Sequence, residues 1–145
     1  MPAVKKPIKR RALPAYSLVI PVRNGGALLI ECMRALMSQS AAPAEIIIFD
    51  TESSDGAAAQ LKNLAGKMPF RFISVGRQEF DHGGTRNAAL KLARHDWVLF
   101  VTQDAVCADS QTVAALLEAA AQPKVAAVYA RQLGHADANP LAASA

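Results

Sequence analysis

Short apolar runs alternate with stretches of helical periodicity along this chain, and that alternation most limits what it can fold into. Strands are predicted at Tyr16–Ile20, Glu45–Phe49, Phe70–Val75, Trp97–Val101 and Val125–Tyr129. Helices are predicted between them, over residues 28–37, 57–64, 83–94 and 110–121. Strands and helices in alternation build a parallel sheet with right-handed crossovers and helices on both faces. The predicted fold class is therefore α/β, with a mainly parallel sheet.

Length and composition fit one globular domain. At 145 residues, with 52% hydrophobic and 19% charged residues, the chain can bury a core without disulfides or a structural metal. Cys32 and Cys107 match no metal-ligand spacing, and we expect buried thiols in a reducing compartment. No apolar run approaches the ~20 residues of a membrane span, and no signal peptide is predicted. We expect a cytoplasmic protein.

The positive charge is concentrated near the start of the sequence. Of 16 Lys and Arg residues, five lie within residues 5–11, so the remaining 11 face 12 Asp and Glu residues. Residues 1–14 are expected to be a disordered basic arm, and residues 15–145 a near-neutral domain. The arm could instead touch anionic lipid and hold the protein peripherally at the inner face of a membrane. The rest of the chain is near neutral and shows no RNP, helix-turn-helix or zinc-finger pattern, which argues against a nucleic-acid partner.

Polar residues follow the predicted strands at the positions where α/β sheets bind ligands. Such ligands lie beyond the carboxyl ends of the strands. The candidates in chain order are Pro21, Arg23, Asn24, Asp50, Glu52, His82, Gly83, Gly84, Arg86, Asn87, Gln103 and Asp104. Because parallel strands all end at one edge of the sheet, the sequence predicts a ligand pocket at that edge.

Carboxylates at two strand ends indicate different chemistry. Asp50 can accept a hydrogen bond from a ribose hydroxyl or a base N–H, although it could also simply cap a loop. Asp104 could ligate Mg²⁺ or Mn²⁺, which use one or two carboxylates together with phosphates and water. Asp55, which precedes Gly56, is expected to cap the following helix.

The segment from His82 to Asn87 is the best candidate for anion binding. Its two glycines let backbone N–H groups approach an anion, and a helix N-terminus adds partial positive charge. Arg86 can reach a phosphate or a base edge, or it could pair with Asp81 or Glu79 instead. His82 can donate to a diphosphate or cap the loop.

Together these segments resemble the inverting glycosyltransferases of family 2. The resemblance runs from about residue 16 to residue 140, and residues 19–24, 50–56, 82–87 and 102–104 carry it. Residues 82–87 are similar to the rhamnosyltransferase-like branch in particular. Glu52 stands where the family usually has Gly, and Thr102 stands where its Asp-x-Asp metal motif has the first acid.

The resemblance implies the Rossmann-like nucleotide-binding half of a GT-A fold. It implies transfer of a sugar such as rhamnose from a dTDP- or UDP-linked donor to a glycan or lipid-linked acceptor. Asp50 would contact the nucleoside, Arg86 the nucleotide, and Asp104 the diphosphate through Mg²⁺ or Mn²⁺.

Family members are considerably longer, so we expect a domain truncated at its C-terminus whose catalytic base follows this chain. Arg131 and Asp137 are the late charged candidates, and neither clearly occupies the base position. The alternative is a non-catalytic module that holds a nucleotide sugar without turning it over.

Overall fold

Four parallel strands form the central sheet of the computed structural model, which describes residues 12–64 and 70–134. They are β1 (Tyr16–Val22), β2 (Glu45–Asp50), β3 (Phe70–Ser74) and β4 (Trp97–Phe100). The strand order is β3-β2-β1-β4, and each neighbouring pair is parallel. The predicted α/β fold with a parallel sheet is confirmed.

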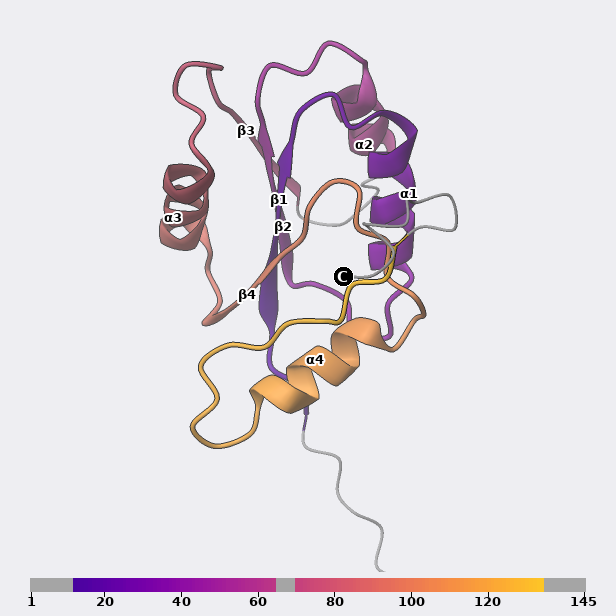
Figure 1. The fold of residues 1–145 in the computed structure, drawn as a ribbon, viewed down its shortest axis with the longest axis vertical. Helices are drawn as coiled ribbons and strands as arrows, with labels where there is room; N and C mark the ends of the chain where they lie inside the picture. The colour runs from indigo at the N-terminus through magenta and orange to yellow at the C-terminus, as the bar shows by residue number, and fades with distance from the viewer. Residues whose placement is uncertain (1–11, 65–69, 135–145) are drawn as a thin grey trace, which may run out of the picture.

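Helices cover both faces of this sheet. They are α1 (Gly26–Met37), α2 (Ala57–Leu64), α3 (His82–Leu92) and α4 (Thr112–Ala120). Figure 1 shows α1 and α2 on one side of the sheet and α3 on the other. The sequence predicts α1 through a stripe of apolar residues at helical spacing, and the structure buries that stripe at Leu29, Cys32, Met33 and Leu36.

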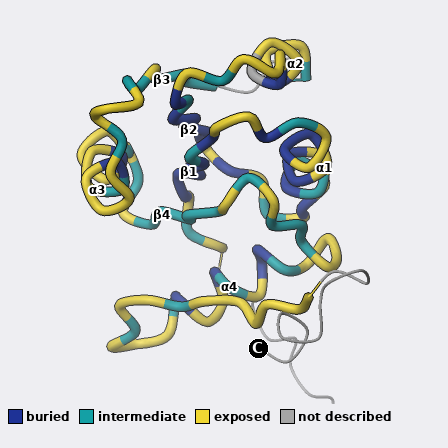
Figure 2. Tube along the Cα trace, turned by 45° about the horizontal axis from the view of Figure 1, so that its top comes forward, coloured by how far each residue is buried: buried dark blue, intermediate teal, exposed yellow. Residues whose placement is uncertain are grey.

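The core divides into two layers because successive side chains of a strand point to opposite faces. Leu18 and Ile20 of β1 pack with Leu61 of α2 and with the buried stripe of α1. On the other face, Val19 packs with Ile47 and with Ala89 of α3. Figure 2 shows the burial concentrated along β1 and β2. These two strands are apolar on both faces, as a parallel strand between two helical layers requires.

β1 continues through Pro21, where the sequence predicts its end. Proline has no N–H to donate, which normally excludes it from a strand with neighbours on both sides. The β1–β4 ladder stops at Val19, which is paired with Phe100, so β4 does not run beside Pro21. Pro21 pairs only with Phe49 of β2, and the strand therefore extends to Val22.

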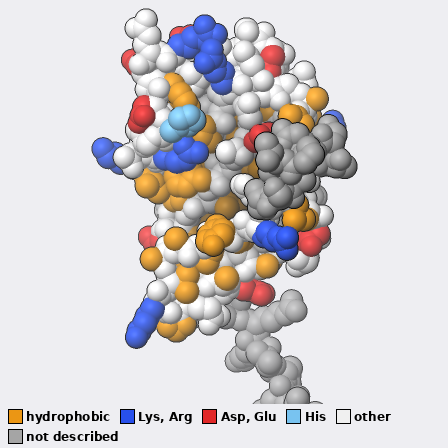
Figure 3. Space-filling view, in the orientation of Figure 1, with side chains coloured by type: hydrophobic (Ala, Val, Ile, Leu, Met, Phe, Trp, Pro, Cys, Tyr) orange, Lys and Arg blue, Asp and Glu red, His pale blue; other side chains and the backbone are white. Residues whose placement is uncertain are grey.

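The predicted fifth strand, residues 125–129, is wrong. This segment forms no strand, and β4 is an edge of the described sheet. A tight turn follows α4, where Lys124 has a φ of 67° and Val125 donates to the carbonyl of Gln122. Tyr129 is 94% exposed. In Figure 3, hydrophobic side chains gather on the lower part of the visible face, where α4 and this segment lie. Apolar composition does not make a strand without a hydrogen-bonding neighbour.

The basic arm, Asp137 and the absence of a membrane span were also predicted from the sequence. Residues 1–11 of the predicted basic arm lie outside the described residues, as does Asp137. Within residues 12–64 and 70–134, none of the helices combines the length and apolar character that a bilayer crossing demands.

Candidate functional site

The loops that follow the four strands meet at the carboxyl edge of the sheet, at the upper end of the molecule in Figure 1. The strand order changes direction at β1, since β2 and β3 lie on one side and β4 on the other. Such a switch point leaves a crevice between the loops that leave in opposite directions. Here those loops begin at Arg23 and Val101, so this is where the predicted site residues have to be sought.

The loop after β1 is joined to the loop after β2. The Asn24 N–H donates to Ser53 Oγ over 2.9 Å, and the Ser54 N–H donates back to Asn24 Oδ1 over 2.8 Å. Asn24 has a φ of 47°, a left-handed conformation that asparagine tolerates better than most residues. These bonds use the backbone N–H and side-chain oxygen of Asn24, which was predicted as a nucleotide contact.

Asp55 connects the starts of two helices. One carboxylate oxygen accepts from the N–H of Gly26, the first residue of α1, over 2.7 Å. The other accepts from the N–H of Ala57, the first residue of α2, over 3.1 Å. The predicted cap of α2 is present, and its second bond to α1 was not foreseen. The one hint of this link in the sequence was that short polar side chains, which readily bond nearby backbone groups, follow both β1 and β2.

Gln103 joins the loop after β4 to the loop after β1. Its Oε1 accepts from the Arg23 N–H over 2.8 Å, and its Nε2 donates to the Arg23 carbonyl over 3.1 Å. Gly25 makes room for this approach, because a Cβ there would lie 3.1 Å from Gln103 Oε1 and 2.7 Å from the Leu29 Cβ. Both ends of the Gln103 amide are thus bonded within the protein.

Asp50 ends β2 with one buried oxygen that has no hydrogen-bond partner. Its Oδ1 and the neighbouring Thr51 Oγ1 are the buried side-chain polar atoms left unpaired in the described residues. An unpaired buried acceptor costs about 1–3 kcal/mol, so such atoms in native proteins usually receive a ligand or a water.

A hollow of about 380 Å³ lies at the same edge. It is lined by Glu52, Gly76, Arg77, Gln78 and Glu79. The Val75 N–H donates to the Asp50 carbonyl over 2.9 Å, which keeps the lining segment next to the end of β2.

Glu52 occupies a left-handed backbone conformation, with a φ of 49°. Glycine enters this region without a steric penalty, whereas a side chain costs about 1–2 kcal/mol there. Glu52 is exposed, so its carboxylate stands in water beside the hollow.

The N-terminus of α3 is capped by Asp81. Its carboxylate accepts from the Gly84 N–H, and its carbonyl accepts from the Thr85 N–H over 2.8 Å. Gly84 permits the close approach, since a Cβ would lie 3.0 Å from Asp81 Oδ2. The predicted anion position at this helix start is therefore shared with a carboxylate of the protein itself. Gly83 lies exposed beside it.

Arg86 stays close to the start of its own helix. Its guanidinium donates to the His82 carbonyl over 2.9 Å. Among the described residues the ion pair present is Arg71–Glu45, so the alternative pairing of Arg86 with Asp81 or Glu79 is not formed. The His82 ring packs edge-on against Phe80 with centroids 5.0 Å apart. The remaining guanidinium donors and the exposed Asn87 lie at the α3 side of the edge.

Asp104 is an exposed carboxylate in the loop after β4. No group of three or more His, Cys, Asp or Glu side chains gathers for a metal within residues 12–64 and 70–134. A protein-only metal cage therefore does not fit these residues. One accessible carboxylate does fit Mg²⁺ or Mn²⁺ held mainly by the phosphates of a ligand and by water.

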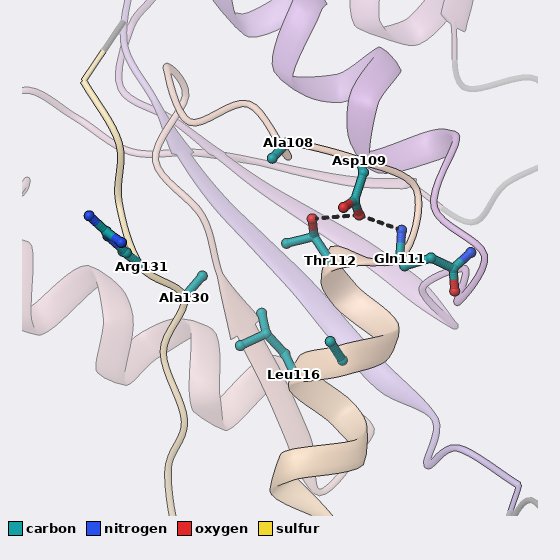
Figure 4. Close-up of a pocket in the computed structure, with 8 residues that line it drawn as sticks. Ala108, Asp109, Gln111, Thr112, Leu116, Ala130 and Arg131 are labelled. Atoms are coloured by element: carbon teal, nitrogen blue, oxygen red, sulfur yellow. Dashed lines mark hydrogen bonds between the residues drawn. The ribbon is translucent and has the colours of Figure 1, made fainter.

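A second hollow, of about 400 Å³, lies between α4 and the segment after it (Figure 4). Asp109 accepts from the Gln111 N–H over 2.8 Å and from Thr112 Oγ1 over 3.1 Å, in the turn directly before α4. The Ser40 N–H, close before β2, donates to the Ser110 carbonyl, so this end of α4 lies near the amino end of the sheet. Arg131 lines this hollow and is not brought to the carboxyl edge.

A parallel sheet between helical layers, with polar loops gathered at its carboxyl edge, defines an α/β domain of the class that binds ligands at that edge. Sequence comparison gives the family. Residues 17–142 match Glycosyl transferase family 2, and the chain belongs to that family.

Curated relatives and solved structures agree with this assignment. The O-antigen chain rhamnosyltransferase WbaN of Salmonella anatum is 39% identical over 132 residues, covering 90% of this chain and 41% of that protein. RfbN of Salmonella typhimurium, of the same description, is 38% identical over 133 residues, covering 89% of this chain and 40% of that protein. The chain thus spans about two-fifths of these relatives. The resemblance to the rhamnosyltransferase-like branch is confirmed.

The fold is also that of solved glycosyltransferases. The mannosyltransferase PcManGT from Pyrobaculum calidifontis, in complex with GDP-Man and Mn²⁺, superposes with a TM-score of 0.67 at 22% identity, covering 82% of this chain and 37% of that one. Residues 1–349 of TarS from S. aureus, in complex with UDP-GlcNAc, give a TM-score of 0.58 at 24% identity, covering 72% and 31%. The predicted GT-A architecture is confirmed.

Proposed function

We propose that this chain binds a nucleoside diphosphate-sugar at the carboxyl edge of its sheet, as the donor-binding part of an inverting glycosyltransferase. The unpaired Asp50 Oδ1 carries the proposal, because a buried acceptor at the end of a central strand needs a donor. A ribose hydroxyl or a base N–H supplies one. The O-antigen chain rhamnosyltransferase relatives favour rhamnose as the sugar and a glycan as the acceptor. A dTDP or UDP carrier and a lipid-linked acceptor are proposed from the family resemblance alone.

We assign the remaining contacts with the nucleotide sugar to other residues of the carboxyl edge. Arg86, whose guanidinium donates to the His82 carbonyl at the start of α3, would use its other donors to bind the charge of the nucleotide. Asp104 would be the protein ligand of Mg²⁺ or Mn²⁺, which needs few protein carboxylates when phosphates and water complete its shell. The cation, when bound, offsets negative charge on the departing nucleoside diphosphate. Pro21, near the end of β1, and Arg23, directly after it, would border the site on the β1 side.

Transfer also needs a carboxylate that takes the proton of the acceptor hydroxyl. Asp109 lies in the turn before α4, near the amino end of the sheet, and Glu118 lies exposed on α4, so neither stands at the carboxyl edge. We assign no base within residues 12–64 and 70–134. The proposal is therefore tested first as donor binding.

Titration of the wild-type chain with UDP and dTDP, with and without Mn²⁺, tests the site. We expect binding that Mn²⁺ strengthens, and a loss of about tenfold or more in Asp50→Asn, the scale of a hydrogen bond to a charged group. Asp104→Asn should remove the Mn²⁺ effect.

Asp96→Asn is the matched control, because it removes one negative charge from an exposed position just before β4, at the opposite end of the sheet. Loss of negative charge alone would strengthen binding of a diphosphate, so weakening in Asp50→Asn reports a specific contact. Equal affinities of Asp50→Asn and Asp96→Asn would overturn the assignment.

Arg86→Ala tests the phosphate side of the same site. We expect binding of the diphosphate to weaken by about 1.5–3 kcal/mol, as when a charged hydrogen bond is lost. Arg34→Ala, an exposed change in the last turn of α1, is the control. An unchanged affinity in Arg86→Ala, with the fold intact by circular dichroism, would leave Arg86 as a surface residue.

A further inference from the structure

The loop after β1 is held from both sides by side chains of two other loops. Gln103 holds it on the β4 side, through two hydrogen bonds to the backbone of Arg23. On the β2 side it is held by Ser53, Ser54 and Asp55. These residues lie 80 and about 30 positions from their partners in the sequence.

The links join the two carboxylates assigned to opposite ends of the nucleotide. Asp50 begins the segment that contains Ser53 and Asp55, whereas Asp104 directly follows Gln103. The connection from one carboxylate to the other therefore passes through the loop after β1. Arg23 is the point where the β4 side of this connection is made.

The Gln103 side chain is suited to fixing the loop after β1 in place. Its acceptor and a donor are both bonded to one backbone unit, which fixes the direction of the whole amide. The absence of a side chain at Gly25 lets the Gln103 side chain approach. The amide keeps one further donor and one further acceptor position, but both of its ends are already fixed within the protein, whereas the buried Asp50 oxygen has no protein partner.

We propose that Gln103 is a positioning residue that sets Asp104 at a fixed separation from Asp50, so that one ligand can engage both. This inference rests on the proposed function. A ligand that bridges two fixed sites gains affinity from their fixed geometry, and it loses that gain when one site can drift. A ligand that touches only one of the sites loses nothing.

The variant Gln103→Met tests this, because methionine keeps the length of the side chain and removes both hydrogen bonds. The probes are UDP with Mn²⁺, or dTDP if the wild type prefers it, together with the matching nucleoside alone and pyrophosphate with Mn²⁺. We expect the nucleoside diphosphate to bind about tenfold more weakly, and both half-ligands to bind within about twofold of wild type. Hydrogen exchange at the Arg23 amide should accelerate in the same variant.

Gln122→Met, in the turn after α4, is the matched control and should change none of these values. Equal weakening of all three probes, or of the nucleoside alone, would overturn the positioning role in favour of general destabilisation or a direct contact. Unchanged binding of the nucleoside diphosphate would also overturn it. If wild-type protein binds neither nucleoside diphosphate, the proposed function itself fails, and the two failures are thereby distinguished.

Discussion

Glu52 and Asp50 are two residues apart, and each departs from what its position would ordinarily favour. Asp50 has a buried oxygen without a hydrogen-bond partner among the described residues. Glu52 keeps a side chain where the backbone is left-handed. Local strain of this kind persists where the surrounding structure enforces it and often marks functional sites. Both residues border the edge at which we place the nucleotide.

Glu52→Gly should stabilise the protein. Glycine removes the steric cost of the left-handed conformation, while its greater freedom in the unfolded chain takes back part of the gain. We expect the free energy of unfolding to rise by about 0.5–1 kcal/mol, measured by urea denaturation. Glu31→Gly, at an exposed position inside α1, should destabilise by about 1 kcal/mol. A loss of stability in Glu52→Gly would show that the Glu52 side chain makes a compensating contact.

The amino ends of the strands are held together by one buried carboxylate. Glu45, the first residue of β2, accepts from Ser17 Oγ over 2.7 Å and from the Arg94 N–H over 2.6 Å. Arg71 of β3 lies 3.5 Å away and forms an ion pair with it. Burial by itself raises the pKa of Glu45, but the hydrogen bonds from Ser17, Arg94 and Arg71, with the charge of Arg71, outweigh it and lower that pKa. The charged form of Glu45 therefore links β1, β2 and β3.

Stability should consequently fall in acid through Glu45. A carboxyl whose pKa is lower in the folded than in the unfolded state contributes stability above its ordinary value near 4.5, and loses it as the pH falls through the folded value. The difference in unfolding free energy between wild type and Glu45→Gln should therefore be largest at neutral pH and shrink below about pH 4.5. Urea titrations at several pH values measure it.

Glu118→Gln is the control for that series, since Glu118 is exposed on α4. At neutral pH it should cost less unfolding free energy than Glu45→Gln, because an exposed side chain gives up no buried hydrogen bonds. A pH-independent difference for Glu45→Gln would mean that the ion pair and the hydrogen bonds do not favour the charged carboxyl.

Burial in the core lowers the reactivity of the two cysteine thiols. Cys32 is fully buried in α1 and donates to the Thr102 carbonyl over 3.7 Å, whereas Cys107 is half-buried. Burial, reinforced by Cys107 and Asp104, raises the pKa of Cys32 to about 12. Burial, followed by the charge of Asp109, also raises the pKa of Cys107. Neither thiol is a ready nucleophile in the folded state.

In Cys107→Ser, labelling of Cys32 should therefore require opening of the core. We expect the rate with a thiol reagent at pH 8 to rise with urea in proportion to the globally unfolded fraction. Cys32→Ser isolates the half-buried thiol and should label faster without denaturant. Rapid labelling of Cys32 in native buffer would show that α1 separates from the sheet by local motion.

Properties that neighbouring residues share were readable from the sequence. The apolar character of β2, the helical stripe of α1 and the polar residues after each strand follow from side-chain chemistry and periodicity. These features predicted the parallel α/β fold, and the motifs after the strands predicted the family. The places of Asp50, at the end of β2, and of Asp104, in the loop after β4, were predictable for the same reason, because the end of a strand can be recognised from the local sequence.

Only the tertiary structure decided which segments become neighbours. The apolar run at residues 125–129 looked like a strand but has no paired neighbour, and β1 passes through Pro21 because β4 stops short of it. Gln103 reads as a ligand residue in sequence, yet it bonds the backbone of Arg23, 80 positions away. Hydrogen bonds between distant segments depend on strand order and on where each ladder ends. These follow from the packing of the whole chain, because each backbone and amide group takes the partner that folding brings within about 3 Å.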